Sequence, residues 1–452
     1  MDMCHGPLLS QIIQFSIPLM LANAMALMFN AADLIVLGHF ASGEAMAAVG
    51  AAPGFTTLML NLFWGIGTGA NVLVARNIGA GDKKNLFRTI HTSMLFACVG
   101  GIVMMAAGLC LTFPVLRMMA VPEKIINKAA LYVMIWCLGI PFMVIYNFGS
   151  YILRAVGDTK RPLLFMGIAG TVNVLMNLFF VIVLKWDVAG VAVATQLSNV
   201  ISAWLIWRTL ATTREQYRLI WKKLHIHLPT LREMLRIGFP AGVQGCMFSV
   251  SNVIIQSTVN SFGWQAIAGN TAALSVEGIT HVSFGAFASA VVSFVGQNHG
   301  AKKYKRLMRS IFYSLECTAV VAAALTIAVL LFKRQLLAVF NPDPAVIEWG
   351  VIRMNYQFSF FVLLGAMEVI IGSLRGLGYS IGPTIVTLMG ACVFRIFWVF
   401  FIFPLDPKMG NLMLSYPASW LLVFLVNGSL LVLVCRNMLK RAKFRQFDDL
   451  SI

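Results

Sequence analysis

Four acidic side chains fall inside long apolar segments of the sequence, and they are the residues best placed to do chemistry. They are Asp33, Glu277, Glu316 and Glu368. An ionised carboxylate in hydrocarbon costs at least about 2.5 to 3.5 kcal/mol, so each group needs a partner, a proton or contact with water. Because burial favours the protonated form of a carboxyl group, such residues predict binding and release of protons or cations.

Asp33 is the main candidate for ion coupling, together with Asn173, Asn177 and Thr195. Asn173 and Asn177 are four residues apart, so in a helix they point from one face. A rise of about 1.5 Å per residue, counted from the outer ends of their segments, places all four groups in the outer half of a membrane. The alternative is that the three neutral side chains only hydrogen-bond between helices.

Glu277 and His281 form a second pair with helical spacing. Four residues apart, they would suit a proton relay or contact with a cationic substrate. Glu316 has no motif around it, and we interpret it as a packing or interfacial residue. Pro18 predicts a kink in the segment that carries Asp33, either static or linked to protonation.

The segments that position these residues are membrane-spanning helices. The 452 residues are 59% hydrophobic and only 11% charged, a balance that excludes an ordinary water-soluble protein. A spanning helix needs roughly 20 mostly apolar residues, and such segments recur along the whole chain. The predicted spans are 13–37, 47–75, 90–116, 127–153, 162–184, 188–207, 237–262, 265–296, 308–332, 345–374, 383–405 and 415–435.

The basic residues predict the orientation of these spans. Most of the 34 Lys and Arg residues lie in the loops after even-numbered spans and in the C-terminal tail. Since cytoplasmic loops carry an excess of Lys and Arg, both termini are expected in the cytoplasm. The formal charge of +17 therefore reflects topology and contact with the lipid bilayer, and no nucleic-acid partner is expected.

An internal repeat predicts two lobes of six helices each. Residues 15–18 (FSIP), 77–80 (NIGA) and 153–157 (LRAVG) match residues 237–240 (IGFP), 298–301 (NHGA) and 374–378 (LRGLG), at an offset of 221 or 222. Because each copy holds an even number of spans, the two lobes are parallel repeats that would rock about a central cavity. The predicted parts are an N-lobe (1–207), a cytoplasmic linker (208–236), a C-lobe (237–436) and a basic tail (437–452).

The repeat also bears on the function of the Asp33 group. Adding the offset to its four residues reaches an isoleucine (254 or 255), Phe394, Trp398 and Tyr416, so the C-lobe has no copy of it. If the fold alone required these polar groups, the matching positions should be polar as well. The asymmetry favours a functional role.

The order and spacing of several motifs resemble the multidrug and toxic compound extrusion (MATE) family, within the multidrug/oligosaccharidyl-lipid/polysaccharide exporter superfamily. The resemblance covers both halves, at residues 15–20, 30–38, 79–82, 153–162, 295–301 and 374–378. It implies a two-lobed transporter of a bacterial inner membrane that exports small organic, often cationic, compounds in exchange for H⁺ or Na⁺. It implies no cofactor and no obligate protein partner.

The resemblance also implies roles for particular residues. One branch of the family uses a carboxylate on the first span, an N-x-x-x-D pair on the fifth and a Thr on the sixth, and Asp33, Asn173 and Thr195 match that pattern. Asn177 departs from it, because the pattern has Asp there. With one carboxylate fewer, Na⁺ binding is weakened and H⁺ is the favoured coupling ion. Other branches of the family use acidic residues in helices 7, 8 or 10, which makes Glu277 and Glu368 candidates for a second coupling site or, alternatively, for paired structural carboxylates.

Other classes of protein fit the sequence less well. A lipid-linked sugar flippase of the same superfamily would have a strongly cationic cavity, whereas only Arg395 reads as a deeply buried basic residue. A membrane-embedded transferase would need a loop with catalytic residues, and the loops have none, so the protein is not expected to be an enzyme. A phosphate-binding loop and a cysteine or histidine cluster are also absent from the sequence, which predicts neither ATP-driven transport nor a metal site.

Overall fold

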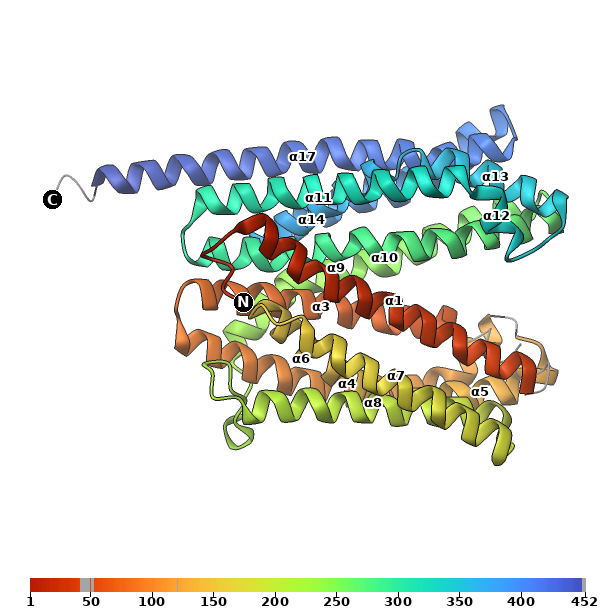
Figure 1. The fold of residues 1–452 in the computed structure, drawn as a ribbon, viewed down its shortest axis with the longest axis horizontal. Helices are drawn as coiled ribbons and strands as arrows, with labels where there is room; N and C mark the ends of the chain where they lie inside the picture. Colours follow the sequence, from red (N-terminus) through yellow and green to blue (C-terminus); the bar gives the residue numbers. More distant parts are fainter. Residues whose placement is uncertain (41–48, 50–52, 120, 449–452) are drawn as a thin grey trace. The chain divides into compact units, whose positions relative to one another are not determined.

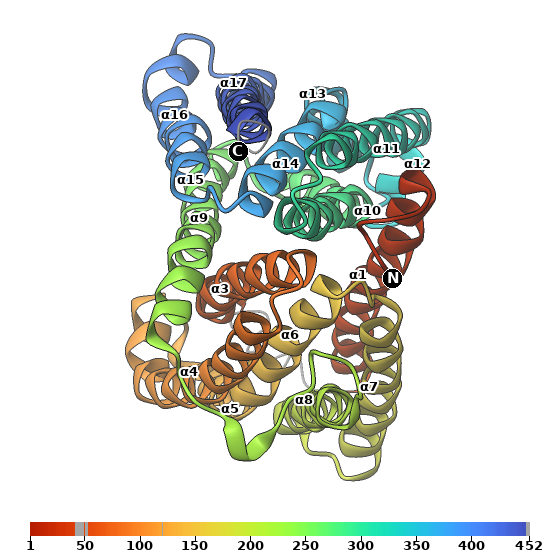
Figure 2. The same cartoon turned by 90° about the vertical axis from the view of Figure 1, so that its left-hand side faces the viewer.

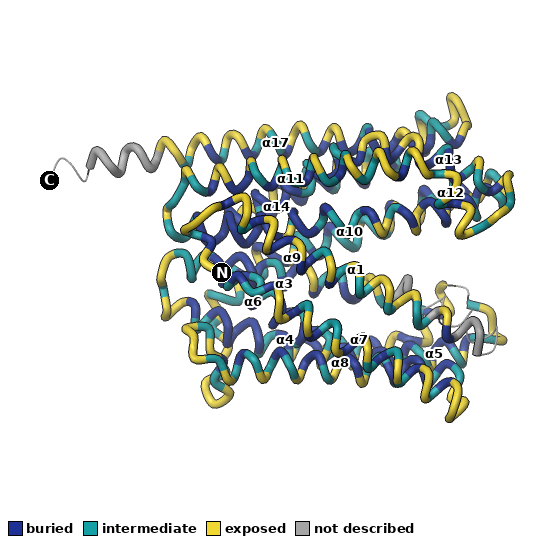
Figure 3. The backbone as a smooth tube through the Cα atoms, viewed as in Figure 1, coloured by how far each residue is buried: buried dark blue, intermediate teal, exposed yellow. Residues whose placement is uncertain are grey.

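The computed structural model describes residues 1–40, 49, 53–119 and 121–448 (Figure 1). These residues form helices joined by short connections, and no strand occurs among them. Exposed positions run along the helices (Figure 3). Many of them are apolar, for example Val103 on α4 and Val320 on α11, at 63% and 64% exposure. Such surfaces suit hydrocarbon, because in lipid an outward-facing apolar side chain costs nothing.

Among the described residues, ten helical segments are long and apolar enough to cross a membrane, and the number rises to twelve when each of two bent pairs is taken as one span. The spans of the first half are α1 (Leu8–Phe40), α3 (Pro53–Gly79), α4 (Lys83–Met118), α5 (Glu123–Leu138) with α6 (Ile140–Ala155), α7 (Lys160–Leu178) with η1 (Phe179–Val183), and α8 (Asp187–Thr212). Those of the second half are α9 (Leu228–Asn260), α10 (Trp264–Gly300), α11 (Tyr304–Leu331), α13 (Pro344–Phe358) with α14 (Phe361–Gly376), α15 (Ile381–Thr387) through η3 (Leu388–Val393), α16 (Phe394–Phe397), η4 (Trp398–Ile402) and η5 (Phe403–Leu405), and α17 (Met409–Asp448). Two short helices complete the list, η2 (Trp221–Lys223) and α12 (Lys333–Ala338).

The prediction of an all-α membrane protein with twelve spanning helices is confirmed, and each predicted span corresponds to one of these segments. Most helices extend beyond the predicted ends, since polar residues continue them past the hydrocarbon core. In the predicted linker, α8 continues to Thr212 and α9 begins at Leu228, which leaves only residues 213–227 between them. Most of the start of the second predicted span, at 47–52, lies outside the described residues.

Two spans are broken at matching places. The axis bends by 46° between α5 and α6, and by 49° between α13 and α14. The second helix of each pair starts 221 residues from the other, at Ile140 and Phe361. Pro141 follows the first break directly and, lacking an N–H group, cannot continue the backbone ladder. The two copies of the repeat therefore share a bend at the same position of one span in each copy.

The chain divides into two compact units, and apart from Met1 the boundaries between them fall inside helices. Unit 1 comprises Met1 and Ile17–Val243, and unit 2 comprises Asp2–Ser16 and Gln244–Ile452. The boundaries lie close to Pro18 in α1 and to Pro240 in α9. The division into lobes, linker and tail remains a prediction. The structure adds that the first turns of α1 belong to unit 2, which otherwise consists of the second half of the sequence, and that the first turns of α9 belong to unit 1.

Within unit 1, glycines allow α9 to lie against α3. A Cβ atom at Gly65 or Gly69 of α3 would overlap backbone atoms of α9, and one at Gly238 or Gly242 of α9 would overlap those of α3. Pairs of glycines four residues apart are typical of close helix contacts in membranes. We call these four residues the glycine seam. Figure 2 views unit 1 along its helices, with α3 beside α9.

Candidate functional site

Asp33 on α1, Asn173 and Asn177 on α7, and Thr195 on α8 lie together in unit 1. The side-chain amide of Asn177 donates a hydrogen bond to Asp33 Oδ1 and lies 3.4 Å from Asn173 Oδ1. The amide of Asn173 donates to Thr195 Oγ1 at 3.3 Å. The structure brings these four side chains together, as the sequence predicts, and we call them the Asp33 cluster.

Packing of small residues brings the three helices of the Asp33 cluster together. Gly170 lies one turn before Asn173 on α7, and a Cβ atom there would overlap the ring of Phe29 on α1. Because Gly170 has no side chain, α1 approaches α7 closely enough for Asp33 to reach Asn177, which lies one turn beyond Asn173. Asn173 and Asn177 are buried, at 4% and 0% exposure, so the carboxylate meets amide groups and not bulk water on this side.

Asp33 lies beside neutral polar groups. Among the described residues, no Lys, Arg or His forms an ion pair with it. The amide of Asn177 is a neutral dipole that supports its charge. The oxygen of that amide, Asn177 Oδ1, is buried and has no hydrogen-bond partner in the part of the chain that the structure describes. The Asp33 cluster therefore holds a carboxylate without a counter-ion beside an acceptor without a donor.

In unit 2, two ion pairs connect α10 to both halves of the bent span. Glu277 Oε2 lies 2.7 Å from Arg353 Nη2 on α13, and His281 Nε2 lies 2.8 Å from Glu368 Oε1 on α14. Glu277 and His281 thus share a helix but have different partners. Both carboxylates are paired, as the structural alternative expects, while the His281 side chain is 44% exposed and remains open to its surroundings.

Arg353 was missed by the sequence analysis, which took Arg395 as the only deeply buried basic residue. That expectation is wrong, because both arginines are only 3% exposed. The helix α13 begins at Pro344 and places Arg353 more than two turns inside it. The predicted span 345–374 already contained Arg353, so the sequence held the signal.

The two buried arginines lie against the same aromatic ring. The guanidinium of Arg395 is 4.2 Å from the ring centroid of Tyr416, and that of Arg353 is 5.3 Å from it. Arg395 Nε donates to Ser419 Oγ at 2.8 Å. Arg353 Nη1 also donates to Asn270 Oδ1 at 2.8 Å.

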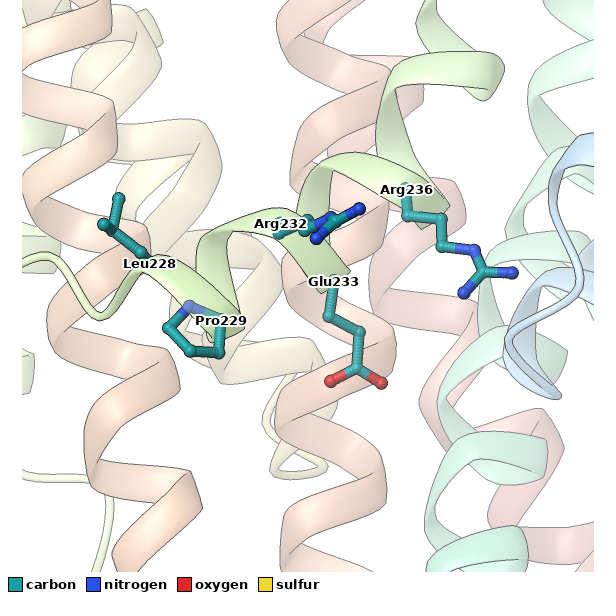
Figure 4. A pocket seen from close by; sticks show the side chains of 5 residues that line it. All are labelled: Leu228, Pro229, Arg232, Glu233 and Arg236. Atoms are coloured by element: carbon teal, nitrogen blue, oxygen red, sulfur yellow. The ribbon is translucent and has the colours of Figure 1, made fainter.

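The remaining predicted residues stay apart from both groups. Glu316 is exposed on α11, and Pro18 lies within α1 several turns before Asp33. A pocket at the start of α9 lies at the other end of unit 1 and is lined by Leu228, Pro229, Arg232, Glu233 and Arg236 (Figure 4). Glu233 pairs with Arg76 of α3 at 2.5 Å and so connects α9 to α3. None of the predicted coupling residues is among the five residues that line this pocket.

Comparison with known proteins adds the family context. A family model described as MatE matches residues 18–179 and again 240–401, so that both ends of the match recur 222 residues later. The chain is 28% identical over 400 residues to the probable multidrug resistance protein YpnP of Bacillus subtilis, covering 87% of this chain and 88% of that protein. It is 25% identical over 402 residues to the probable multidrug resistance protein NorM of Thermotoga maritima, covering 85% and 84% of the two chains. The structure described as the outward-facing conformation of a multidrug resistance MATE family transporter is similar in fold, with a TM-score of 0.90, 22% identity, and 97% and 98% of the two chains covered.

Proposed function

The chain belongs to the MatE family, and from that premise we propose that it exports organic compounds by antiport, with Asp33 as the coupling group. The names of its relatives as multidrug resistance proteins support drug-like substrates. The proposed substrates are small compounds with a cationic group, and the proposed location is the plasma membrane of a bacterium. The proposal needs no cofactor, nucleic acid, protein partner or catalytic residue.

The observation that carries the proposal is the pairing of Asp33 with a neutral amide. An ionised Asp33 accepts a hydrogen bond from the Asn177 N–H group. A protonated Asp33 would become a donor, and the amide oxygen of Asn177, which has no partner among the described residues, would be its acceptor after rotation of the amide. The same pair can therefore hold both protonation states, as a site that loads and unloads a proton must.

The number of charges favours H⁺ over Na⁺ as the coupling ion. A hard cation prefers oxygen ligands, and Asp33, Asn177 and Thr195 could provide them. Only one of these groups carries a charge, which leaves Na⁺ weakly held. A proton needs a single carboxyl group and its hydrogen-bond partners, and both are present.

A change at Asp33 can reach the shape of unit 1 through α1. Gaining a proton changes the hydrogen bond that connects α1 to α7, while Pro18 removes one backbone hydrogen bond further down the same helix. We propose that bending near Pro18 accompanies protonation. Glu277, His281 and Glu368 remain proposed as a second coupling site or as contacts for substrate.

The test is ethidium efflux from reconstituted vesicles, driven in turn by a pH gradient and by a Na⁺ gradient. The wild type should respond to the pH gradient, and Asp33→Asn should lose about tenfold or more of that efflux, since one removed coupling group abolishes ion-driven exchange. Glu316→Gln is the matched control, because it removes an exposed carboxylate elsewhere in a span. Efflux that ignores both gradients, or that survives in Asp33→Asn, would refute the proposal.

The flippase alternative keeps one supporting observation. With Arg353 added to Arg395, the scarcity of buried basic residues no longer argues against an anionic, lipid-linked cargo. A vesicle assay with a fluorescent lipid pyrophosphate would decide between the two. Translocation of that lipid without ethidium efflux would favour the flippase.

A further inference from the structure

We propose that unit 2 contains an oxyanion site built from Arg353, Arg395 and Tyr416, which receives a carboxylate or phosphate group of the exported compound. This inference rests on the proposed export function and extends its substrates from cations to zwitterions. It follows from four features of unit 2: an imbalance of charge, unused hydrogen-bonding atoms, the position of the group in the repeat, and the helix that carries Arg395.

The charges in this group do not balance. Two guanidinium groups lie against the ring of Tyr416, and both are 3% exposed. Among the described residues, the only carboxylate that hydrogen-bonds to either of them is Glu277, which is paired with Arg353. Arg395 has a hydroxyl group, that of Ser419, as its acceptor. A buried charge without an opposite charge is costly, so one anion would complete the group.

Hydrogen-bonding atoms remain unused at the same place. Arg353 Nε is buried and has no acceptor in the described part of the chain. The amide nitrogen of Gln357, one turn along α13, meets only the sulfur of Met413 at 3.6 Å, and sulfur is a weak acceptor. Arg395 uses Nε alone in its hydrogen bond to Ser419, and its two terminal nitrogens have no hydrogen-bond acceptor among the residues described. The planar fork of a guanidinium matches carboxylate and phosphate oxygens, which identifies the class of ligand.

The repeat shows that neither charged group is copied in the other unit. At the offset of 221, Arg353 corresponds to Tyr132, Arg395 to Val174, and Tyr416 to Thr195 of the Asp33 cluster. Asp33 in turn corresponds to an isoleucine of the second half (254 or 255). Since neither charge is present in both copies, the fold alone does not account for them.

The helix that carries Arg395 departs from its counterpart in unit 1. Two π-helical segments, η3 (Leu388–Val393) and η4 (Trp398–Ile402), flank α16 on both sides. The matching helix α7 is followed by one such segment, η1, which corresponds to η4. The residues of α7 that match η3 are α-helical. Because π-helical turns are frequent at functional sites, the additional turn beside Arg395 supports a ligand there.

The experiment compares two dyes that differ in a single group. Rhodamine 110 carries a free carboxylate, and rhodamine 123 is its cationic methyl ester. Binding to the full chain in lipid nanodiscs is measured by fluorescence anisotropy without any ion gradient. The wild type should bind the acid about tenfold or more tightly than the ester, as expected for hydrogen bonds to a charged group. Arg395→Gln should lose this preference while the affinity for the ester stays the same.

Further variants and salts distinguish an oxyanion site from a general loss of binding and from a halide site. Arg395→Lys keeps the charge without the planar fork and should retain part of the preference, whereas Ser419→Ala keeps both guanidinium groups and should retain it fully. Equal affinity for the two dyes in the wild type, no saturable binding of either, or an equal loss for both dyes in Arg395→Gln would overturn the proposal. Displacement of the acid by millimolar chloride but not by gluconate would show a halide site and would also overturn it. A failure of antiport would appear in the gradient assay and not in this one.

Discussion

The Asp33 cluster, the proposed coupling site, consists of few groups. One carboxylate, one amide with a free oxygen and two further polar side chains meet in the interior of unit 1. What distinguishes H⁺ from Na⁺ at such a site is the number of charges, because a proton is held by one carboxyl group and a cation gains from each additional carboxylate. The choice of ion should therefore change with a single residue.

Asn177→Asp tests this choice directly. The substitution places a second carboxylate beside Asp33, and we expect efflux to become dependent on a Na⁺ gradient, at a rate several-fold above that of the wild type under the same gradient. The measurement is ethidium flux in vesicles at fixed pH with varied Na⁺. Asn260→Asp, at the exposed end of α9, is the control. An unchanged response to Na⁺ would mean that the Asp33 cluster does not select the ion.

The ion pair between Arg353 and Glu277 yields a second prediction at this scale. Arg353→Met leaves Glu277 without its partner and should destabilise the protein by about 3 to 5 kcal/mol, as removal of one member of a buried pair does. Glu277→Leu combined with Arg353→Met should restore most of that loss. Thermal unfolding in nanodiscs of the two single variants and the double variant measures the coupling. Strictly additive losses would show that the pair contributes nothing.

Among the helices, the glycine seam is the contact that tolerates substitution least. Gly65→Leu would place a side chain where α3 and α9 touch through their backbones, and it should lower both the yield of folded protein and its melting temperature. Gly428→Ala is the control, because a Cβ atom there has its nearest neighbour at 3.7 Å and the helix should be unaffected or slightly stabilised. Equal melting temperatures for the two variants would contradict the role of the seam.

The helices and their breaks differ in how well the sequence predicts them. Hydropathy predicts all twelve spans, because a run of apolar residues of membrane length has few other uses. It does not predict the bends at Gly139 and at Ser359–Phe360, since hydropathy is continuous through both. Pro141, which frees a carbonyl group within its span and permits bending, predicts the first bend, but the second bend has no proline beside it.

The two polar groups differ for a related reason. The Asp33 cluster was predictable because Asn173 and Asn177 have helical spacing and depth can be counted along each span. The partners of Glu277 and His281 could not be predicted from their spacing, since Arg353 and Glu368 come from the two halves of a bent span. A straight helix would have placed these two residues differently.

At the scale of the whole molecule, the repeat joins two units of similar fold and different chemistry. Unit 1 holds an acid, Asp33, that has no counter-ion among the described residues, whereas unit 2 buries two arginines, of which Arg353 is paired with Glu277 and Arg395 bonds to a hydroxyl group. The orientation of both units is predicted by the basic residues. In unit 1 the segment 213–227 returns to α4, where the backbone of Ile220 donates to His91 Nε2 at 3.0 Å.

Thiol labelling in whole cells tests that orientation. In a chain freed of its eight cysteines, Ser261→Cys, in the turn between α9 and α10, should react with a membrane-impermeant maleimide. Gln216→Cys, in the segment 213–227, should react only in everted vesicles, because the positive-inside rule places that segment in the cytoplasm. The opposite pattern would invert the topology and the direction of transport.

We propose that the protein exchanges the exported compound for a proton at Asp33. This exchange is tested by measuring whether an outward flow of ethidium drives protons inward. Coupling between two bound species is reciprocal, so a gradient of ethidium alone must move protons the other way. Vesicles with a trapped pH indicator are loaded with ethidium and diluted into buffer without it, at equal pH on both sides. We predict acidification of the interior with the wild type and none with Asp33→Asn. Release of ethidium without a change of internal pH in the wild type would contradict the account.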